Sequence, residues 1–191
     1  MSIQKGQPGY IKAQKTKYLM WAIGEFAIVI ALIILGYIQT GSKLNVFTVI
    51  AIVGCLPASK MLVEFITMAP HKSIEPEKYQ EITEKAPMLT TVFDTIITGN
   101  DKVMPVDAFV ISGHTVCGYT SSSKTDEVKA ARYIKEMLHN NRCEKVTVKI
   151  FHDYKAFITR AEGMNSIASV EQAETKKRER RIRKLILTTS I

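Results

Sequence analysis

Two pairs of residues carry side chains that could bind zinc. His114 and Cys117 form the first pair, and His139 and Cys143 form the second. A structural zinc site needs all four side chains to converge as a tetrahedron. Residues three apart on a strand point to opposite faces of the sheet, and a strand is the expected setting of His114 and Cys117. We therefore expect no metal and no other cofactor, a buried Cys117 and histidines at the surface.

Asp107 lies in the apolar stretch PVDAFVIS. Together with His114 and one of the serines at 121–123, it would supply the residue types of a nucleophilic triad. The strained turn that exposes a serine nucleophile has the pattern G-x-S-x-G, and this pattern does not occur around these serines. The serines fit a simpler role as the cap of the following helix. We therefore expect no catalytic residue here.

The strongest charge signal is a basic segment near the C-terminus. The chain has a formal net charge of +8, and the surplus is concentrated in residues 176–184, KKRERRIRK. The basic residues of this segment are Lys176, Lys177, Arg178, Arg180, Arg181, Arg183 and Lys184. Such clusters attract anionic lipid head groups or nucleic acid phosphates, and they also occur on solvated helix faces. We expect lipid binding, with Ile182, Leu185 and Ile186 as a narrow apolar strip toward the membrane.

Two apolar runs are long enough to cross a bilayer. The first covers residues 18–39 with Glu25 as its one charge, and the second covers residues 44–69. About 20 apolar residues span the hydrocarbon core. A signal peptide would be shorter, and a small-x-small cleavage site would follow it. Because only TGSK separates the runs, the sequence predicts an antiparallel transmembrane hairpin.

The lysines around the hairpin predict its orientation. Lys5, Lys12, Lys15 and Lys17 precede the first run with no acid among them, whereas the connecting loop contains Lys43. Basic residues stay on the cytoplasmic side. The sequence therefore predicts a protein of the cell membrane with both termini in the cytoplasm. Its cysteines would lie in a reducing compartment or in the membrane, so no disulfide is expected.

One contact inside the hairpin can also be predicted. With the turn near Ser42, residues at equal depth have numbers that sum to about 84, so Glu25 lies level with Lys60. A charge inside a membrane is costly unless it is paired. We therefore expect an ion pair between Glu25 and Lys60 that fixes the hairpin register, rather than an ion pathway.

The remaining residues predict an α+β domain with the order αβββαβα. The expected elements are a helix at 76–85, strands at 88–98, 106–111 and 115–120, a helix from a Ser123 cap to Asn140, a strand at 145–151, a helix from an Asp153 cap to about Gly163, and a basic helix at 166–187. Residues 88–98 also fit a helical stripe, so a helix stays open there. The expected divisions are a basic N-terminus at 1–17, the hairpin at 18–69, a linker at 70–75, the domain at 76–165 and the basic helix at 166–191.

The first 70 residues resemble a group of bacterial membrane proteins. The stretches GYIKAQKTKYLMWAIGEFAIVIALIILG and VGCLPASKMLVEFI are similar to small two-span proteins of Gram-positive, clostridial-type bacteria. This group is sometimes labelled O-linked GlcNAc transferase-like. The chain has neither the helical repeats nor the phosphate-binding glycine loop that would support the label. The resemblance therefore implies a membrane anchor and no catalytic motif.

Residues 76–160 resemble the PD-(D/E)XK nuclease core, in particular membrane-linked nuclease-related domains. The resemblance rests on the element order and on Pro105-Val106-Asp107 at the start of the second strand. Such nucleases hold Mg²⁺ with this Asp and with an acid-x-Lys motif on the next strand. The corresponding stretch here is Thr120-Ser121-Ser122, with neither acid nor lysine. The resemblance implies a degenerate, non-cleaving copy in which Asp107 is vestigial.

Together these features predict a membrane-anchored, non-enzymatic cytoplasmic module that binds a protein partner or the anionic membrane surface. The alternative is an enzyme that acts on nucleic acid or on a sugar nucleotide. The sequence leaves open which protein would be the partner, whether nucleic acid binds, and whether a second copy of the chain does.

Overall fold

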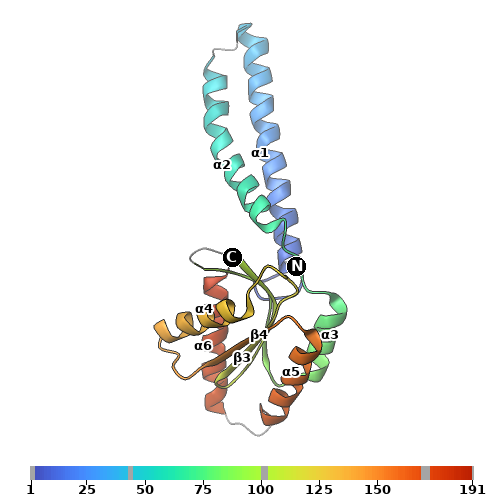
Figure 1. Ribbon diagram of the computed structural model, residues 1–191. Coiled ribbons are helices and arrows are strands. Elements are labelled where there is room, and N and C mark those ends of the chain that lie inside the picture. The colour runs from blue at the N-terminus through green and yellow to red at the C-terminus, as the bar shows by residue number, and fades with distance from the viewer. Residues whose placement is uncertain (1–2, 43–44, 100–102, 169–172, 191) are drawn as a thin grey trace. The chain divides into compact units, whose positions relative to one another are not determined.

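The computed structural model describes residues 3–42, 45–99, 103–168 and 173–190 (Figure 1). The chain divides into two compact units, Ile11–Lys72 and Met1–Tyr10 with Ser73–Ile191. The first unit is a helical hairpin and the second contains a sheet with helices. The expected fold class, an α+β domain that follows an N-terminal helical hairpin, is confirmed.

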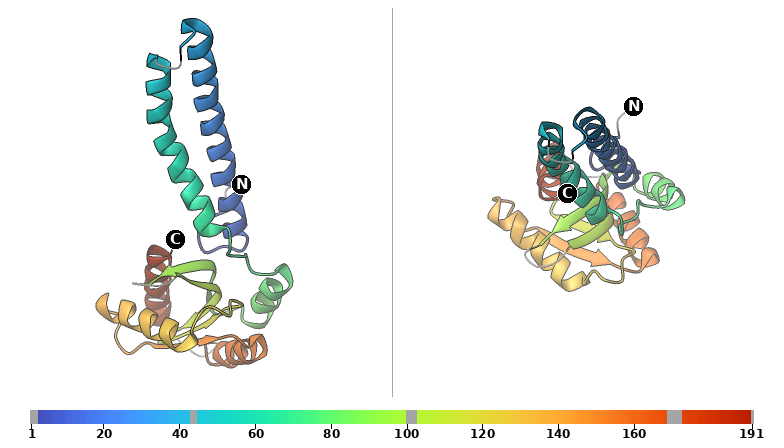
Figure 2. Two further views of the ribbon diagram at one scale, coloured as in Figure 1. Left: turned by 45° about the horizontal axis from the view of Figure 1, so that its top comes forward. Right: turned by 90° about the horizontal axis from the view of Figure 1, so that it is seen from above.

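Two apolar helices form the hairpin, α1 (Tyr10–Thr40) and α2 (Val46–Met68). Both are long and apolar enough to cross a membrane, and they run side by side in opposite directions (Figures 1 and 2). Asn45 caps α2 by accepting a hydrogen bond of 2.9 Å from the backbone N–H of Thr48. At the other end, Lys15 donates to the carbonyl oxygen of Ala69 at 2.7 Å. This lysine therefore stabilises the last turn of α2.

Small residues allow the two helices to approach closely. Ala51 and Ala58 of α2 are fully buried, and Gly54 lies between them. A Cβ atom added at Gly54 would lie 3.3 Å from the Val29 side chain of α1. The residue numbers of Val29 and Gly54 sum to nearly 84, the value expected for residues at equal depth in the hairpin. The packing thus agrees with the register predicted from the short loop.

A four-stranded sheet forms the centre of the second unit, in the order β1-β2-β3-β4. Its strands are β1 (Thr90–Thr98), β2 (Val103–Ser112), β3 (Thr115–Tyr119) and β4 (Thr147–Phe151). The first three strands form an antiparallel meander, and β4 is parallel to β3. A parallel pair needs a crossover connection, and α4 (Glu127–Asn140) supplies it. Residues 90–98, for which a helix had also been possible, form the strand β1.

Helices cover both faces of this sheet (Figure 1). α4 and α6 (Ala173–Thr189) lie on one face, and α3 (Pro76–Lys85) and α5 (Tyr154–Ala168) lie on the other. Along β2, Phe109 packs toward α4 and α6, whereas Ala108 and Val110 pack toward α3 and α5. Because both faces are covered, β2 is buried along nearly its whole length, and its apolar residues do not alternate with exposed polar ones.

Three helix boundaries differ from the sequence prediction. α4 begins at Glu127 because Asp126, rather than Ser123, caps it. The Asp126 carboxylate accepts hydrogen bonds of 3.0 Å from the backbone N–H groups of Val128 and Lys129. α5 continues past Gly163 to Ala168, since Met164 on its next turn is buried against the sheet. α6 begins at Ala173, later than the expected residue 166.

α6 packs on the sheet as part of the domain. Ile182 and Ile186 have no exposed surface and belong to the same core cluster as Phe109. The apolar strip expected to face the membrane is therefore used inside the domain. For the same reason, α6 belongs to the compact domain, whose end was expected at residue 165.

The first residues of the chain also belong to the domain. The carbonyl oxygen of Gly6 accepts a hydrogen bond of 3.0 Å from the N–H of Phe93 on the outer edge of β1. Gly6 has a φ of +86°, and an added Cβ would lie 2.7 Å from Leu187. Glycine is therefore required at this position. On the linker, the N–H of Ile74 donates to the Asp94 carboxylate at 2.8 Å, which fixes the linker to β1.

Candidate anion-binding cleft

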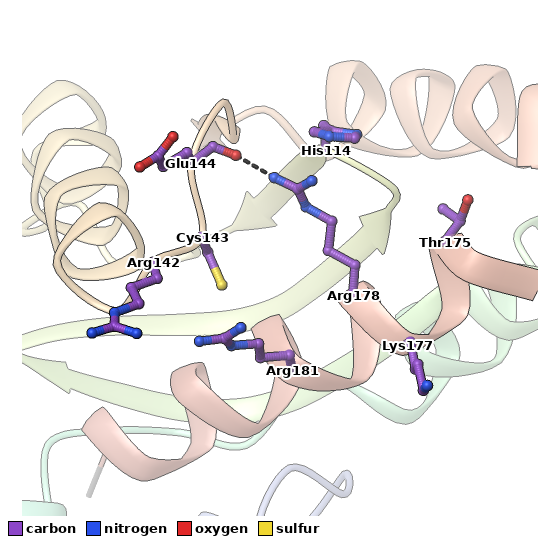
Figure 3. Close-up of a pocket in the computed structure, with 8 residues that line it drawn as sticks. All are labelled: His114, Arg142, Cys143, Glu144, Thr175, Lys177, Arg178 and Arg181. Carbon is purple, nitrogen blue, oxygen red and sulfur yellow. Dashed lines mark hydrogen bonds between the residues drawn. The ribbon is translucent and has the colours of Figure 1, made fainter.

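A basic cleft of about 800 Å³ opens on the α4–α6 side of the domain (Figure 3). Its lining comes from the β2–β3 turn, the α4–β4 loop and α6. The residues are His114, Arg142, Cys143, Glu144, Thr175, Lys177, Arg178 and Arg181. Three segments that are far apart in the sequence thus meet at one site.

The helical period of α6 separates its residues between the core and the cleft. Glu179, Ile182 and Ile186 are buried, and their spacing places them on one face of the helix. Arg178 and Arg181 are three residues apart, so they share a neighbouring face. Both side chains extend from α6 toward the α4–β4 loop (Figure 3).

The buried face of α6 is fixed by hydrogen bonds as well as by packing. The Glu179 carboxylate, only 2% exposed, accepts a hydrogen bond of 2.7 Å from Thr90 and one of 3.0 Å from the Gly113 N–H. Lys176 forms an ion pair of 3.4 Å with the same carboxylate. These contacts hold α6 against β1 and against the turn that carries His114.

The α4–β4 loop has an unusual backbone beside the cleft. Arg142 and Lys145 have φ angles of 61° and 58°, a region that residues other than glycine rarely adopt. Arg181 donates a hydrogen bond of 3.1 Å to the Asn141 carbonyl oxygen, and Arg178 donates to the Glu144 carbonyl oxygen. The two arginines of α6 therefore hold the loop in place with part of their hydrogen-bonding capacity.

The charge of the cleft is strongly positive. Four lining residues, Arg142, Lys177, Arg178 and Arg181, are permanent cations, and Glu144 is the one acid among the described lining residues. The Glu144 carboxylate points away from Arg178 (Figure 3). Among the side chains that the structure describes, which exclude those of residues 169–174, no carboxylate forms an ion pair with any of the four cations. The buried Nε of Arg178 also has no hydrogen-bond partner there.

The seven basic residues predicted to bind lipid therefore have different environments. Lys177, Arg178 and Arg181 line the cleft, while Lys176 donates to the Met88 carbonyl oxygen at 2.6 Å. Arg183 lines a separate hollow beside the N-terminal segment. Arg180 and Lys184 are exposed and line none of the hollows described here. The cleft residues could be found in the sequence only as members of a charge cluster, because their partners lie more than 30 residues away.

Asp107 lies on β2, on the side of the domain that α3 and α5 cover. It is 8% exposed, and its carboxylate accepts a hydrogen bond of 2.6 Å from the Ser121 N–H. Burial raises the pKa of Asp107, although the hydrogen bond from Ser121 opposes this. The antiparallel register places it opposite Thr120. The described residues contain no group of three metal-binding side chains, here or elsewhere.

The members of the two histidine–cysteine pairs lie at separate places in the domain. Cys117 is buried on the face covered by α5, and this burial raises the pKa of its thiol. Cys143 and His114 line the cleft, whereas His139 lines a neighbouring hollow. All three cysteines of the chain are free thiols. The structure thus brings together His114 and Cys143, one residue from each pair.

Glu25 and Lys60 do not meet in the hairpin. Glu25 is on the α1 face that packs on α2, with one carboxylate oxygen buried and without a hydrogen-bond partner in the described residues. Lys60 is exposed because it lies two residues, or more than half a turn, from the buried Ala58. Among the described residues, no ion pair joins the two charges.

Comparisons with protein-family models, with curated proteins and with solved structures find no match to this chain. The interpretation of the cleft therefore rests on its own geometry and charge.

Proposed function

We propose that the protein is a membrane-anchored module that acts by binding an anionic partner in the basic cleft. In this proposal the hairpin crosses the cell membrane, with both termini and the α+β domain in the cytoplasm. The lysines that precede the apolar run at 18–39 support this orientation, because basic residues remain on the cytoplasmic side.

The observation that carries the proposal is the set of four cations that form no ion pair with any carboxylate among the described side chains. Like charges on one surface repel each other and destabilise the fold. The position of these cations is nevertheless fixed. Arg178 and Arg181 donate hydrogen bonds to the α4–β4 loop, and Glu179 holds α6 to the β2–β3 turn. An anionic partner would neutralise the repulsion.

The geometry favours binding over catalysis. Asp107 has a serine N–H as its neighbour where a metal-dependent nuclease would have a second acid. In the cleft, an activated thiol would need a base within hydrogen-bond distance. Within the described residues, no hydrogen bond joins Cys143 to His114.

Binding of a generic polyanion tests the proposal. The full chain in neutral detergent is applied to immobilised heparin, and the salt concentration at elution is measured. The variant Arg178→Gln/Arg181→Gln removes two charges from the cleft, and the control Arg180→Gln/Lys184→Gln removes two from the outer face of the same helix. We expect the cleft variant to elute at clearly lower salt than the control. Equal elution of the two variants would mean that only net charge matters, and the proposal would fail.

A further inference from the structure

We propose that the cleft binds a compact ligand that carries two or more phosphate groups. This inference rests on the proposed function and names the ligand class of the same site. Three properties of the cleft point to it: the number of cations, the type of their side chains and the absence of Phe, Tyr and Trp among the described lining residues.

The number of cations exceeds what one phosphate can neutralise. A phosphate ester has a charge of about −1.5 to −2 at neutral pH, whereas the cleft holds four permanent cations and one acid that points away. The negative charge of a diphosphate or triphosphate is closer in magnitude to the positive charge of the cleft. The volume of about 800 Å³ is also within the range of small-molecule pockets, roughly 300–1,000 Å³, and exceeds the needs of a single phosphate ion.

The side-chain types favour phosphate over other anions. Three of the four permanent cations are arginines, whose planar guanidinium groups bind two phosphate oxygens at once. Arg178 and Arg181 each use N–H groups on loop carbonyl oxygens, but a guanidinium has five donors, so others stay available.

The lining argues against recognition of a nucleic acid strand. None of the described residues that line the cleft is a Phe, Tyr or Trp, so the imidazole of His114 is the one ring among them on which a base could stack. Base stacking supplies much of the affinity of single-strand binding proteins. The ligand is therefore recognised through its phosphates. These could belong to a soluble molecule or to a lipid head group that carries two phosphates.

Isothermal titration of the full chain, in phosphatidylcholine nanodiscs, with inorganic phosphate, pyrophosphate and tripolyphosphate tests the inference. We expect affinity to rise with each added phosphate. We expect Arg178→Gln/Arg181→Gln to weaken tripolyphosphate binding at least about tenfold, while Arg180→Gln/Lys184→Gln changes it by less than about threefold. Arg142→Gln is a second test, because the Arg142 side chain forms no described hydrogen bond and its loss should not disturb folding. It should weaken tripolyphosphate binding as well.

Two further measurements separate the outcomes. Nanodiscs with and without cardiolipin, a lipid with two phosphates, identify the source of the ligand: cardiolipin that lowers the affinity for tripolyphosphate indicates a lipid head group, and an unchanged affinity indicates a soluble ligand. Titration with a single-stranded RNA oligonucleotide tests the competing class. RNA binding that needs Arg178 and Arg181, without tripolyphosphate binding, would overturn this inference and leave the proposed function intact. Binding of none of these anions would overturn both.

Discussion

The carboxylate of Glu179 accepts a hydrogen bond of 3.0 Å from the backbone N–H of Gly113. This bond joins α6, which carries three of the cleft cations, to the β2–β3 turn, where His114 follows Gly113. A single acid within a strongly basic segment thus sets the position of the basic residues on either side of it. Because the bond is buried, removing either partner would leave the other without a hydrogen bond and would lower the stability of the domain.

Replacement of Glu179 should therefore destabilise the domain. Glu179→Ala leaves the Thr90 hydroxyl and the Gly113 N–H without their acceptor, and we expect a loss of about 1–3 kcal/mol in the free energy of unfolding. Urea unfolding of the full chain in detergent, followed by labelling of the buried thiols Cys117 and Cys143, measures it. Glu84→Ala is the control, because Glu84 is exposed on α3. Equal stability of the two variants would show that the Glu179 contacts contribute nothing.

Gly118 offers a second test of the packing. A Cβ atom added at this position of β3 would lie 2.6 Å from Ile150 and 2.8 Å from the Phe109 ring. Overpacking of this kind costs about 1–3 kcal/mol, so Gly118→Ala should lower the urea midpoint. Gly163→Ala is the matched control, since nothing lies within 4 Å of an added Cβ there and α5 is helical. The control should raise stability by about 0.4–1 kcal/mol, and a reversed order of the two variants would contradict the packing.

Asp107 should make stability depend on pH. Its pKa is raised by burial, so the folded state holds the proton at a pH where the unfolded state has released it. The free energy of unfolding therefore falls as pH rises from the ordinary Asp pKa, about 3.9, through the raised value. Asp107→Asn removes this dependence and should become more stable relative to wild type between about pH 4 and pH 7.

Near-ultraviolet circular dichroism of the full chain during urea unfolding, at each pH, gives this difference. Because every other titrating group is common to both proteins, the difference isolates Asp107. A difference that stays constant across the range would show that Asp107 ionises as an ordinary surface carboxyl does.

The orientation of the hairpin can be tested with reporter fusions. A reporter at Ser42, between the two helices, should be active only outside the cytoplasm, and one fused to the C-terminus should be active only inside it. In the proposed topology, the four lysines that precede the apolar run at 18–39 determine the orientation. Replacing Lys12, Lys15 and Lys17 with glutamine should shift part of the population to the opposite orientation. A C-terminal reporter that reports an external location in the unmodified protein would contradict the proposed topology.

Much of the fold follows from local patterns in the sequence. The helix at Pro76–Lys85 was predictable from punctuation and periodicity, and both helices of the hairpin were predictable from apolar length. The strand at Thr90–Thr98 was not settled by its pattern, because the same residues also fit a helical stripe. The cap of α4 was less predictable as well, because Ser123 and Asp126 are both good caps and the turn Ser122–Thr125 decides between them.

The cleft itself could not be predicted, because its residues meet only through the packing of α6 on the sheet. One signal was nevertheless present in the sequence. Glu179, Ile182 and Ile186 recur at helical spacing inside the basic segment, a pattern typical of a buried face. It indicates a helix docked on a core, and therefore cations arranged on the remaining faces. The contact of Arg178 and Arg181 with the α4–β4 loop has no counterpart in any local pattern.

Hydrogen exchange, measured by mass spectrometry on the full chain with and without tripolyphosphate, tests the central claim that the cleft binds anions. We predict slower exchange in peptides that cover residues 141–146 and 175–182, because these ranges contain most of the described residues that line the cleft. Peptides from α5, which covers the opposite face of the sheet, should be unchanged. Arg178→Gln/Arg181→Gln should abolish the protection. Protection that is absent from the cleft, or that persists in this variant, would contradict the claim.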